Sequence, residues 1–147
     1  MRHRRLRAGR DRIEAAVGLL DSKARLFMGG CPPGELSIAF LTDAALARLH
    51  DRFMADPSAT DVITFEGDPA HAMAGEICVS VDAAARHAGK SSAALSRELT
   101  LYVVHGWLHL AGYDDRSPAD RRAMRGAEAR AMGILSRAGS VPVFKLA

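Results

Sequence analysis

The sequence predicts an α+β fold in one domain, residues 1–147, built from a small mixed β-sheet of about four strands covered by helices. Three observations support this prediction. A chain of 147 residues has a common single-domain size and can bury a core without cross-links. Short segments rich in β-branched and aromatic residues alternate with segments of helical apolar spacing. The longest helical pattern, residues 92–111, is also the most apolar, so it is expected to be the central helix.

The first part of the chain predicts a helix followed by a strand. Apolar side chains recur at helical spacing over residues 13–27. The pairs Gly-Gly at 29–30 and Pro-Pro at 32–33 end this pattern. Residues 35–41 then have the composition of a strand.

The middle of the chain predicts a helix and two more strands. Residues 42–43 (Thr-Asp) supply an N-cap for a helix that ends near Phe53. Residues 60–65 are β-branched and aromatic, and residues 75–81 alternate apolar and polar side chains. These two segments are expected to complete the sheet.

The last part of the chain predicts three helices. Residues 82–88 suit a short helix, and residues 92–111 suit a long helix closed by Gly112. The last helix is expected over about residues 118–132, with Ser117 as its cap and a proline at its first position.

Positive charge is concentrated at the start of the chain. The formal net charge is +3, and six arginines occur within residues 1–12. Two interpretations stay open, an arm that contacts nucleic acid and a disordered, solvated terminus. A secretory signal is not expected, because the apolar stretch at residues 15–20 is short and follows Glu14 directly. No apolar run approaches the about 20 residues of a membrane span, so a cytoplasmic protein without a membrane partner is expected.

The two cysteines, Cys31 and Cys78, form no Cys-x-x-Cys pattern. They therefore indicate neither a disulfide framework nor a thiolate zinc site. Both are expected to be small buried side chains in a reducing compartment.

Two histidines near the end of the central helix suggest a metal site. His105 and His109 are four residues apart, so their side chains project from one face with Cβ atoms about 5–6 Å apart and both can reach one ion. An unpartnered imidazole in so apolar a helix would be costly. Gly112 lets the chain turn back, and Asp114 and Asp115 are then the candidates for a third ligand.

The residue between the histidines argues against peptide hydrolysis. Zinc peptidases of the His-Glu-x-x-His type carry their general base at the position of Gly106, which has no side chain. The spacing His-x-x-x-His-x-x-Gly-x-x-Asp is similar to that of extended zinc peptidases. A peptidase would need a carboxylate from elsewhere, such as Glu76 or Glu98. Trp107 is expected to lie in the core.

Residues 105–115 resemble the hallmark of the YbeY family, His-Gly-x-Leu-His-Leu-x-Gly-Tyr-Asp-His, and ten of the eleven positions conform. Residues 60–65 resemble the family's Thr-Asp-Val-Leu-Ser-Phe, and residues 75–77 its Gly-Asp-Ile. Residues 97–99 also have the family's character. The resemblance extends over roughly residues 36–133.

The resemblance implies a single-strand-specific metallo-endoribonuclease that acts in rRNA processing, at the 3′ end of 16S rRNA, and in ribosome quality control. It implies one Zn²⁺ per chain, or another divalent transition metal, with His105, His109 and Asp115 as metal ligands and catalytic residues. Asp114 is then left with a role in stabilising the turn or in orienting the metal ligands. The implied partners are single-stranded RNA, rRNA, and a ribosomal subunit or ribosome-associated proteins.

Two positions depart from the family. Asp115 stands where the family has a third histidine, which chemistry tolerates because carboxylate oxygen also binds zinc. The carboxylate lowers the charge of the site by one, so a higher pH optimum is expected than for Asp115→His. Met54 stands where the family carries an arginine, and Arg52 would have to replace it from another face of its helix; the alternative is that Arg52 is simply solvated.

Arginines that follow the metal loop could form one flank of an RNA groove, or only a solvated helix face. They are Arg116, Arg121, Arg122 and Arg125. An alternative function is an RNA-binding ribosome-assembly factor with a structural metal. A structural zinc site usually has four protein ligands, whereas three are found here, which favours an enzyme. The general base, the native metal, the cleavage site and the oligomeric state stay open.

Overall fold

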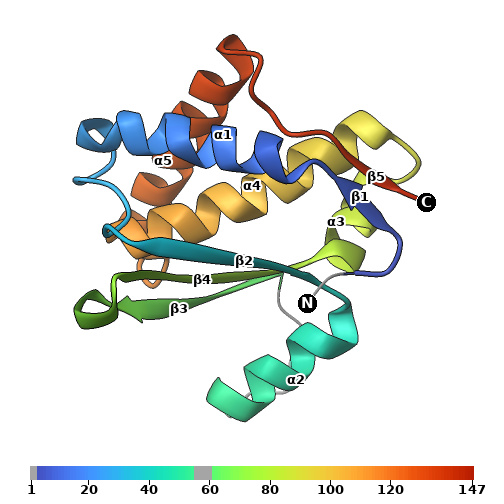
Figure 1. Ribbon diagram of the computed structural model, residues 1–147, viewed down its shortest axis with the longest axis horizontal. Helices are drawn as coiled ribbons and strands as arrows, with labels where there is room; N and C mark the ends of the chain where they lie inside the picture. The colour runs from blue at the N-terminus through green and yellow to red at the C-terminus, as the bar shows by residue number, and fades with distance from the viewer. Residues whose placement is uncertain (1–2, 55–60) are drawn as a thin grey trace.

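A computed structural model describes residues 3–54 and 61–147, without the side chain of Met54. Its main sheet has the strand order β2-β4-β3, with β2 (Glu35–Leu41) parallel to β4 (Met73–Ser80) and β3 (Val62–Asp68) antiparallel to β4. The sheet is therefore mixed, and the α+β prediction is confirmed (Figure 1). Thr60, at the start of the predicted middle strand, lies outside the described residues.

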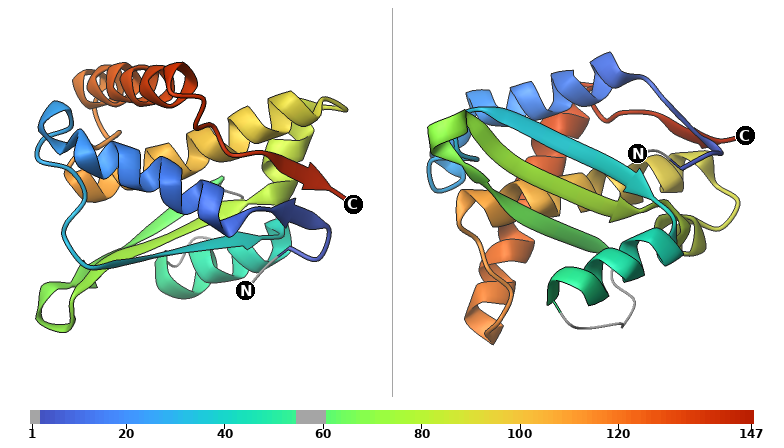
Figure 2. Two further views of the ribbon diagram at one scale, coloured as in Figure 1. Left: turned by 45° about the horizontal axis from the view of Figure 1, so that its top comes forward. Right: turned by 60° about the horizontal axis from the view of Figure 1, so that its bottom comes forward.

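The helices are α1 (Arg10–Ser22), α2 (Asp43–Met54), α3 (Val81–Ala88), α4 (Ser92–Ala111) and α5 (Pro118–Arg137), with short 3-10 turns at Ala24–Leu26 and Pro69–His71. Helix α4 crosses one face of the sheet, with α1 and α5 packed around it, and α2 packs against one end of the other face (Figures 1 and 2). Two groups of buried side chains correspond to these layers. Leu46 of α2 packs with Ile63 and Cys78, while the larger core lies on the α4 side.

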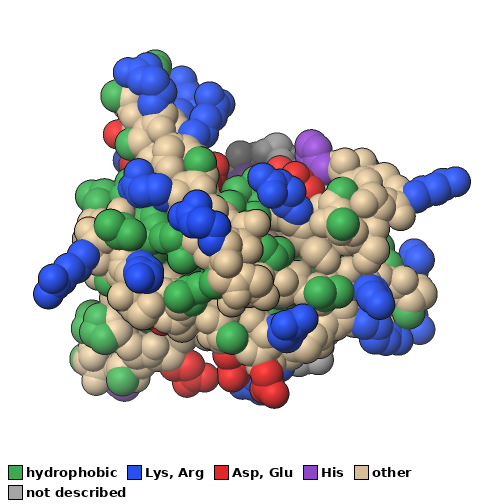
Figure 3. Space-filling model, turned by 90° about the horizontal axis from the view of Figure 1, so that it is seen from above, with side chains coloured by type: hydrophobic (Ala, Val, Ile, Leu, Met, Phe, Trp, Pro, Cys, Tyr) green, Lys and Arg blue, Asp and Glu red, His purple; other side chains and the backbone are tan. Residues whose placement is uncertain are grey.

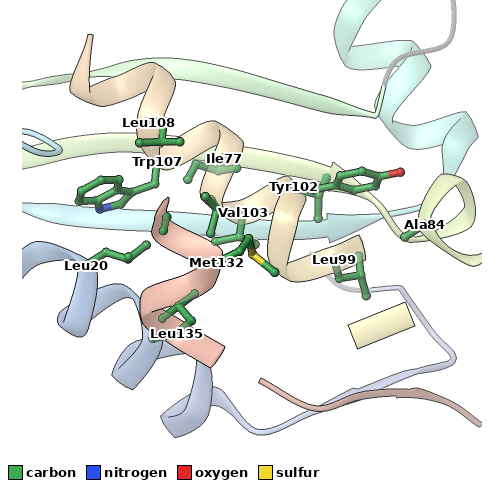
Figure 4. Close-up of a cluster of buried hydrophobic side chains, with 14 of the residues drawn as sticks. Leu20, Ile77, Ala84, Leu99, Tyr102, Val103, Trp107, Leu108, Met132 and Leu135 are labelled. Carbon is green, nitrogen blue, oxygen red and sulfur yellow. The ribbon is translucent and has the colours of Figure 1, made fainter. Parts of the chain in front are cut away.

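The larger core is built around α4. Trp107 is fully buried, and the ring of Phe27 meets it edge-on with centroids 5.4 Å apart. Figure 4 shows Leu20 of α1 and Leu135 of α5 converging on the same helix. Trp107 is thus a core residue, as its position in the helix predicted.

Most predicted elements have the expected bounds. The long helix runs over Ser92–Ala111 as predicted, and the hydroxyl of Ser117 accepts a hydrogen bond from the backbone N–H of Asp120 at 3.0 Å. Helix α5 continues to Arg137, because Leu135 extends its buried stripe. The first helix ends earlier than predicted, at Ser22, because a separate turn at Ala24–Leu26 brings Phe27 into the core.

The start of the chain is folded from His3 onward, and the interpretation of residues 1–12 as a disordered terminus is wrong for this part. Strand β1 (Leu6–Ala8) pairs antiparallel with β5 (Phe144–Leu146), and α1 begins at Arg10. The sequence did not predict this two-stranded sheet, because its partners lie at opposite ends of the chain. Phe144 is 1% exposed, so burial of its ring stabilises the pairing.

Both cysteines are free thiols; Cys78 is buried as predicted, whereas Cys31 is only half-buried. Burial raises the pKa of Cys31 to about 11 and that of Cys78 to about 12. Both thiols are therefore poor nucleophiles at neutral pH. Across residues 3–54 and 61–147, no helix combines the length and apolar character needed to cross a membrane.

Candidate functional site

Close packing fixes how α4 is rotated against the sheet. A Cβ atom at Gly106 would lie 2.5 Å from Cγ2 of Ile77 on β4, so only glycine allows this approach. At the next position, the indole Nε1–H of Trp107 donates a hydrogen bond to the carboxylate of Asp21 at 3.0 Å. With Gly106 against the sheet and Trp107 against α1, the side chain of His105 is directed toward α5.

The imidazole of His105 is held by a carboxylate of α5. Its Nδ1 lies 2.7 Å from Oε2 of Glu128, and the two side chains are only 28% and 19% exposed. A proton on Nδ1 shared with this carboxylate leaves Nε2 with a free lone pair, which is the arrangement that orients metal-binding histidines. The hydrogen bond that Nδ1 donates to Glu128 raises the pKa of His105, burial opposes this rise, and the charges of Glu128 and Asp115 add to it.

The loop after α4 brings Asp115 back toward His105. Gly112, with φ of +120°, ends the helix. Oδ2 of Asp115 lies 3.9 Å from Nε2 of His105. Asp114 accepts a hydrogen bond from the backbone N–H of Asp115 at 2.8 Å and pairs with Arg116 at 3.3 Å. These contacts agree with the turn-stabilising role expected for Asp114.

The spacing of the two side chains is close to what one ion can bridge. Zinc lies about 2.0–2.1 Å from an imidazole nitrogen and about 2.0–2.2 Å from a carboxylate oxygen, so in tetrahedral coordination the two atoms stand about 3.3–3.5 Å apart. The observed 3.9 Å between His105 and Asp115 is slightly longer, and a small shift of the exposed Asp115 side chain would bring both atoms to one ion. His109 is exposed one turn further along α4. Among the described residues, no three His, Cys, Asp or Glu side chains form a complete metal-binding group, so His109 is not gathered with the other two.

Glu128 is the site residue that sequence reasoning missed. It lies four residues from both Met124 and Met132, which are 2% and 6% exposed. A carboxylate on the buried stripe of a helix is costly without a partner. This interruption of an apolar stripe was the signal that could have identified it.

The predicted RNA-contact residues fall in two places. Arg121 donates from Nη1 to the backbone carbonyl oxygens of Asp115 and Arg116, at 3.4 and 3.3 Å, and so braces the loop. Arg122 is exposed in the first turns of α5. Figure 3 shows a projecting part of the surface that carries several Lys and Arg side chains. Arg52 lies on α2, across the sheet from α4, with its guanidinium 5.4 Å from the ring centroid of Phe53.

Met54, where the resemblance led us to expect an arginine in the family, has its side chain outside the described part of the structure. Because α2 packs on the other face of the sheet, no described contact connects Arg52 to His105.

Neither distant carboxylate considered as a peptidase base is close to His105. Glu76 accepts a hydrogen bond from Cys78, whose side chain belongs to the α2 face of the sheet. Glu98 lies two helical turns before His105, about 10 Å along the helix axis.

Comparisons with known proteins all indicate the same family. The sequence model of the family described as "Endoribonuclease YbeY" matches residues 9–136. The endoribonuclease YbeY of Chlamydia muridarum is 43% identical over 110 residues, which cover 70% of this chain and 68% of the relative. The endoribonuclease YbeY of Anaeromyxobacter dehalogenans is 38% identical over 141 residues, which cover 92% of this chain and 67% of the relative. The solution structure of TM1509 from Thermotoga maritima has the same fold, with a TM-score of 0.51 at 22% identity and coverage of 90% of this chain and 89% of that one.

Proposed function

The chain belongs to the endoribonuclease YbeY family, and we propose that it is a metal-dependent endoribonuclease that hydrolyses phosphodiester bonds in single-stranded RNA. The observation that carries the metal dependence is the arrangement of His105 between two carboxylates. Glu128 binds its Nδ1 at 2.7 Å, and Asp115 approaches its Nε2 at 3.9 Å.

In this proposal His105, His109 and Asp115 hold one divalent ion, for which the exposed side chain of His109 must turn toward the other two, and zinc suits this ligand set. A bound ion would supply Lewis-acid polarisation of a phosphoryl oxygen and activation of water. Glu128 keeps the proton of His105 on Nδ1, so that Nε2 is available as a ligand. With three protein ligands, a coordination position remains for the substrate.

The cations beside the site would bind the RNA backbone. Arg116 and Arg122 are exposed next to the loop that carries Asp115, where they can meet phosphate groups. Arg121 has a different role, because its guanidinium donates to loop carbonyl oxygens. It positions Asp115 and adds positive charge to the same flank.

The peptidase alternative is not favoured by the packing of α4. A glutamate at position 106 would have to displace Ile77, whose Cγ2 lies 2.5 Å from the position of a Cβ there. The position faces the sheet and not the side chain of His105. The assembly-factor alternative is not favoured either, since the relatives are named as endoribonucleases.

The substrate we propose is rRNA, with processing near the 3′ end of 16S rRNA and a role in ribosome quality control, in association with a ribosomal subunit or its proteins. This rests on membership of the family. A cytoplasmic location follows from that substrate, because ribosomes are assembled there. Mapping of 16S rRNA 3′ ends in cells depleted of the protein tests this part.

One experiment tests the activity itself. Purified protein is incubated with labelled single-stranded RNA and with casein, with and without a chelator, beside the variants His105→Ala and Asp115→Ala. RNA cleavage that requires the metal and is lost in both variants is the expected result. His71→Ala is the matched control, since His71 is exposed and pairs with Asp68 in a separate turn. Cleavage that persists in both site variants contradicts the proposal.

A further inference from the structure

A groove of about 450 Å³ lies between α4 and α5, and Glu128, the residue that holds His105, is one of the residues that line it. Its volume lies in the range of about 300–1,000 Å³ that is usual for ligand sites. Along α4 the groove is lined by Arg97 and Leu101, which precede His105 by two turns and one turn of the helix. The groove therefore continues the stripe of α4 that carries the candidate site.

The walls of the groove carry two cations. Arg97 of α4 and Arg125 of α5 are both exposed. In the described part of the chain, neither guanidinium has an ion-pair or hydrogen-bond partner, whereas Arg116 and Arg121 do. The carboxylate of Glu128, which also lines the groove, is paired with His105. The groove thus offers two unpaired positive charges to an anionic ligand.

The floor of the groove is apolar. Leu101 is partly buried, and Met132 is 6% exposed. A methionine sulfur makes favourable contacts with aromatic rings, so this floor suits the face of a nucleobase. Proteins that bind single strands combine such apolar contacts with a positively charged path for the backbone.

We propose that the α4–α5 groove binds the RNA strand next to the scissile nucleotide, with its phosphates on Arg97 and Arg125 and a base against Leu101 and Met132. This inference rests on the proposed function, because it takes the His105 site as the place of cleavage. It adds a binding path that leads away from that site along α4. Arg116, in the loop after α4, and Arg122, in the first turns of α5, lie near the C-terminal end of α4.

The test measures RNA binding separately from cleavage. A fluorescent single-stranded RNA is titrated in the presence of a chelator, so that no metal-dependent hydrolysis occurs, and anisotropy gives the dissociation constant. The double variant Arg97→Gln/Arg125→Gln is expected to bind about tenfold more weakly. Its plot of log affinity against log salt should lose about 1.4 of its slope, the value for two phosphate contacts with a single strand.

A matched control removes the same charge elsewhere. Arg48→Gln/Lys90→Gln changes exposed cations of α2 and of the turn before α4, and its salt slope should equal that of the unchanged protein. Leu101→Ala tests the floor, and it should weaken binding without changing the salt slope. Thermal unfolding of each variant verifies that it is folded.

The outcomes separate this inference from the proposed function. If the affinity and the salt slope of Arg97→Gln/Arg125→Gln are unchanged, the groove does not bind RNA. This conclusion holds even if the protein cleaves RNA when metal is restored. If the double variant binds RNA more weakly but the unchanged protein cleaves no RNA when metal is present, the groove is supported as an RNA-binding site. The proposed endoribonuclease activity is then contradicted.

Discussion

Nδ1 of His105 on α4 lies 2.7 Å from Oε2 of Glu128 on α5, and this contact joins two helices at the candidate site. The imidazole is thereby held in one orientation and one tautomer, with Nε2 facing Asp115. Several consequences can be measured, both for metal binding and for the stability of the metal-free protein.

Glu128→Gln should weaken zinc binding by about 10- to 100-fold, because an amide orients His105 less firmly and removes a charge next to it. Competition with a chromophoric chelator measures the affinity. Glu66→Gln removes an exposed acid of β3 and is expected to bind zinc like the unchanged protein. Equal affinities in all three proteins would show that Glu128 has no positioning role.

The metal-free protein should become less stable as the pH rises. Glu128 raises the pKa of His105 above its ordinary value of 6.5. The stabilisation by the imidazolium–carboxylate pair is therefore fully present below about pH 6.5 and is lost as the pH rises through the folded pKa. Urea unfolding with a chelator, between about pH 5 and 8, should show this loss in the unchanged protein but not in Glu128→Gln.

Gly106→Ala should destabilise the protein. Overpacking against Ile77 costs about 1–3 kcal/mol, and the better helix propensity of alanine offsets only about 1 kcal/mol of it. Gly126→Ala is the control, because a Cβ there meets nothing within 4 Å, so this variant should be slightly more stable. In a protein that already carries Ile77→Ala, Gly106→Ala should no longer lower the free energy of unfolding. An equal loss of stability in that protein would show that contact with Ile77 is not the cause.

Asp43→Asn should lower stability at neutral pH. The carboxylate of Asp43 accepts hydrogen bonds from Arg86 and, at 2.6 Å, from the hydroxyl of Ser80. Both bonds lower the pKa of Asp43, and the bond from Arg86 has the larger effect. A lowered pKa stabilises the fold above the unfolded value, and the effect disappears as the pH falls through the folded value. Asp43 is 38% exposed, so screening limits the loss to about 0.5–1 kcal/mol.

The control for Asp43→Asn is Asp11→Asn, since Asp11 is also an acid in the first turn of a helix. Urea unfolding at neutral and acid pH compares the two variants. The deficit of Asp43→Asn should shrink toward acid pH, and a deficit that is constant with pH would exclude the ionised carboxylate as its cause.

Asp115→His should lower the pH at which RNA cleavage reaches half of its maximal rate. A neutral imidazole in place of a carboxylate makes the site more positive by one charge. This favours deprotonation of a metal-bound water at lower pH. Matched pH–rate profiles measure the change. A profile for Asp115→His that is unchanged or shifted to higher pH contradicts Asp115 as a ligand.

Local sequence features were enough to predict much of this protein. The bounds of α4, the cap at Ser117, and the placement of His105 and His109 on one helix follow from periodicity and capping residues, which act between neighbours in the chain. The resemblance over residues 105–115 likewise needed only adjacent positions, and the family it indicated is the family to which the chain belongs.

Only the tertiary structure decided how that helix is used. The absence of a side chain at Gly106 argued against a peptidase from sequence, but its packing on Ile77 gives the physical cause. The selection of Glu128 as the partner of His105, and the pairing of β1 with β5, depend on which surfaces meet after folding. Side-chain periodicity determines which face of an element is apolar, whereas the partner of a buried polar group is set by contacts between elements far apart in the chain.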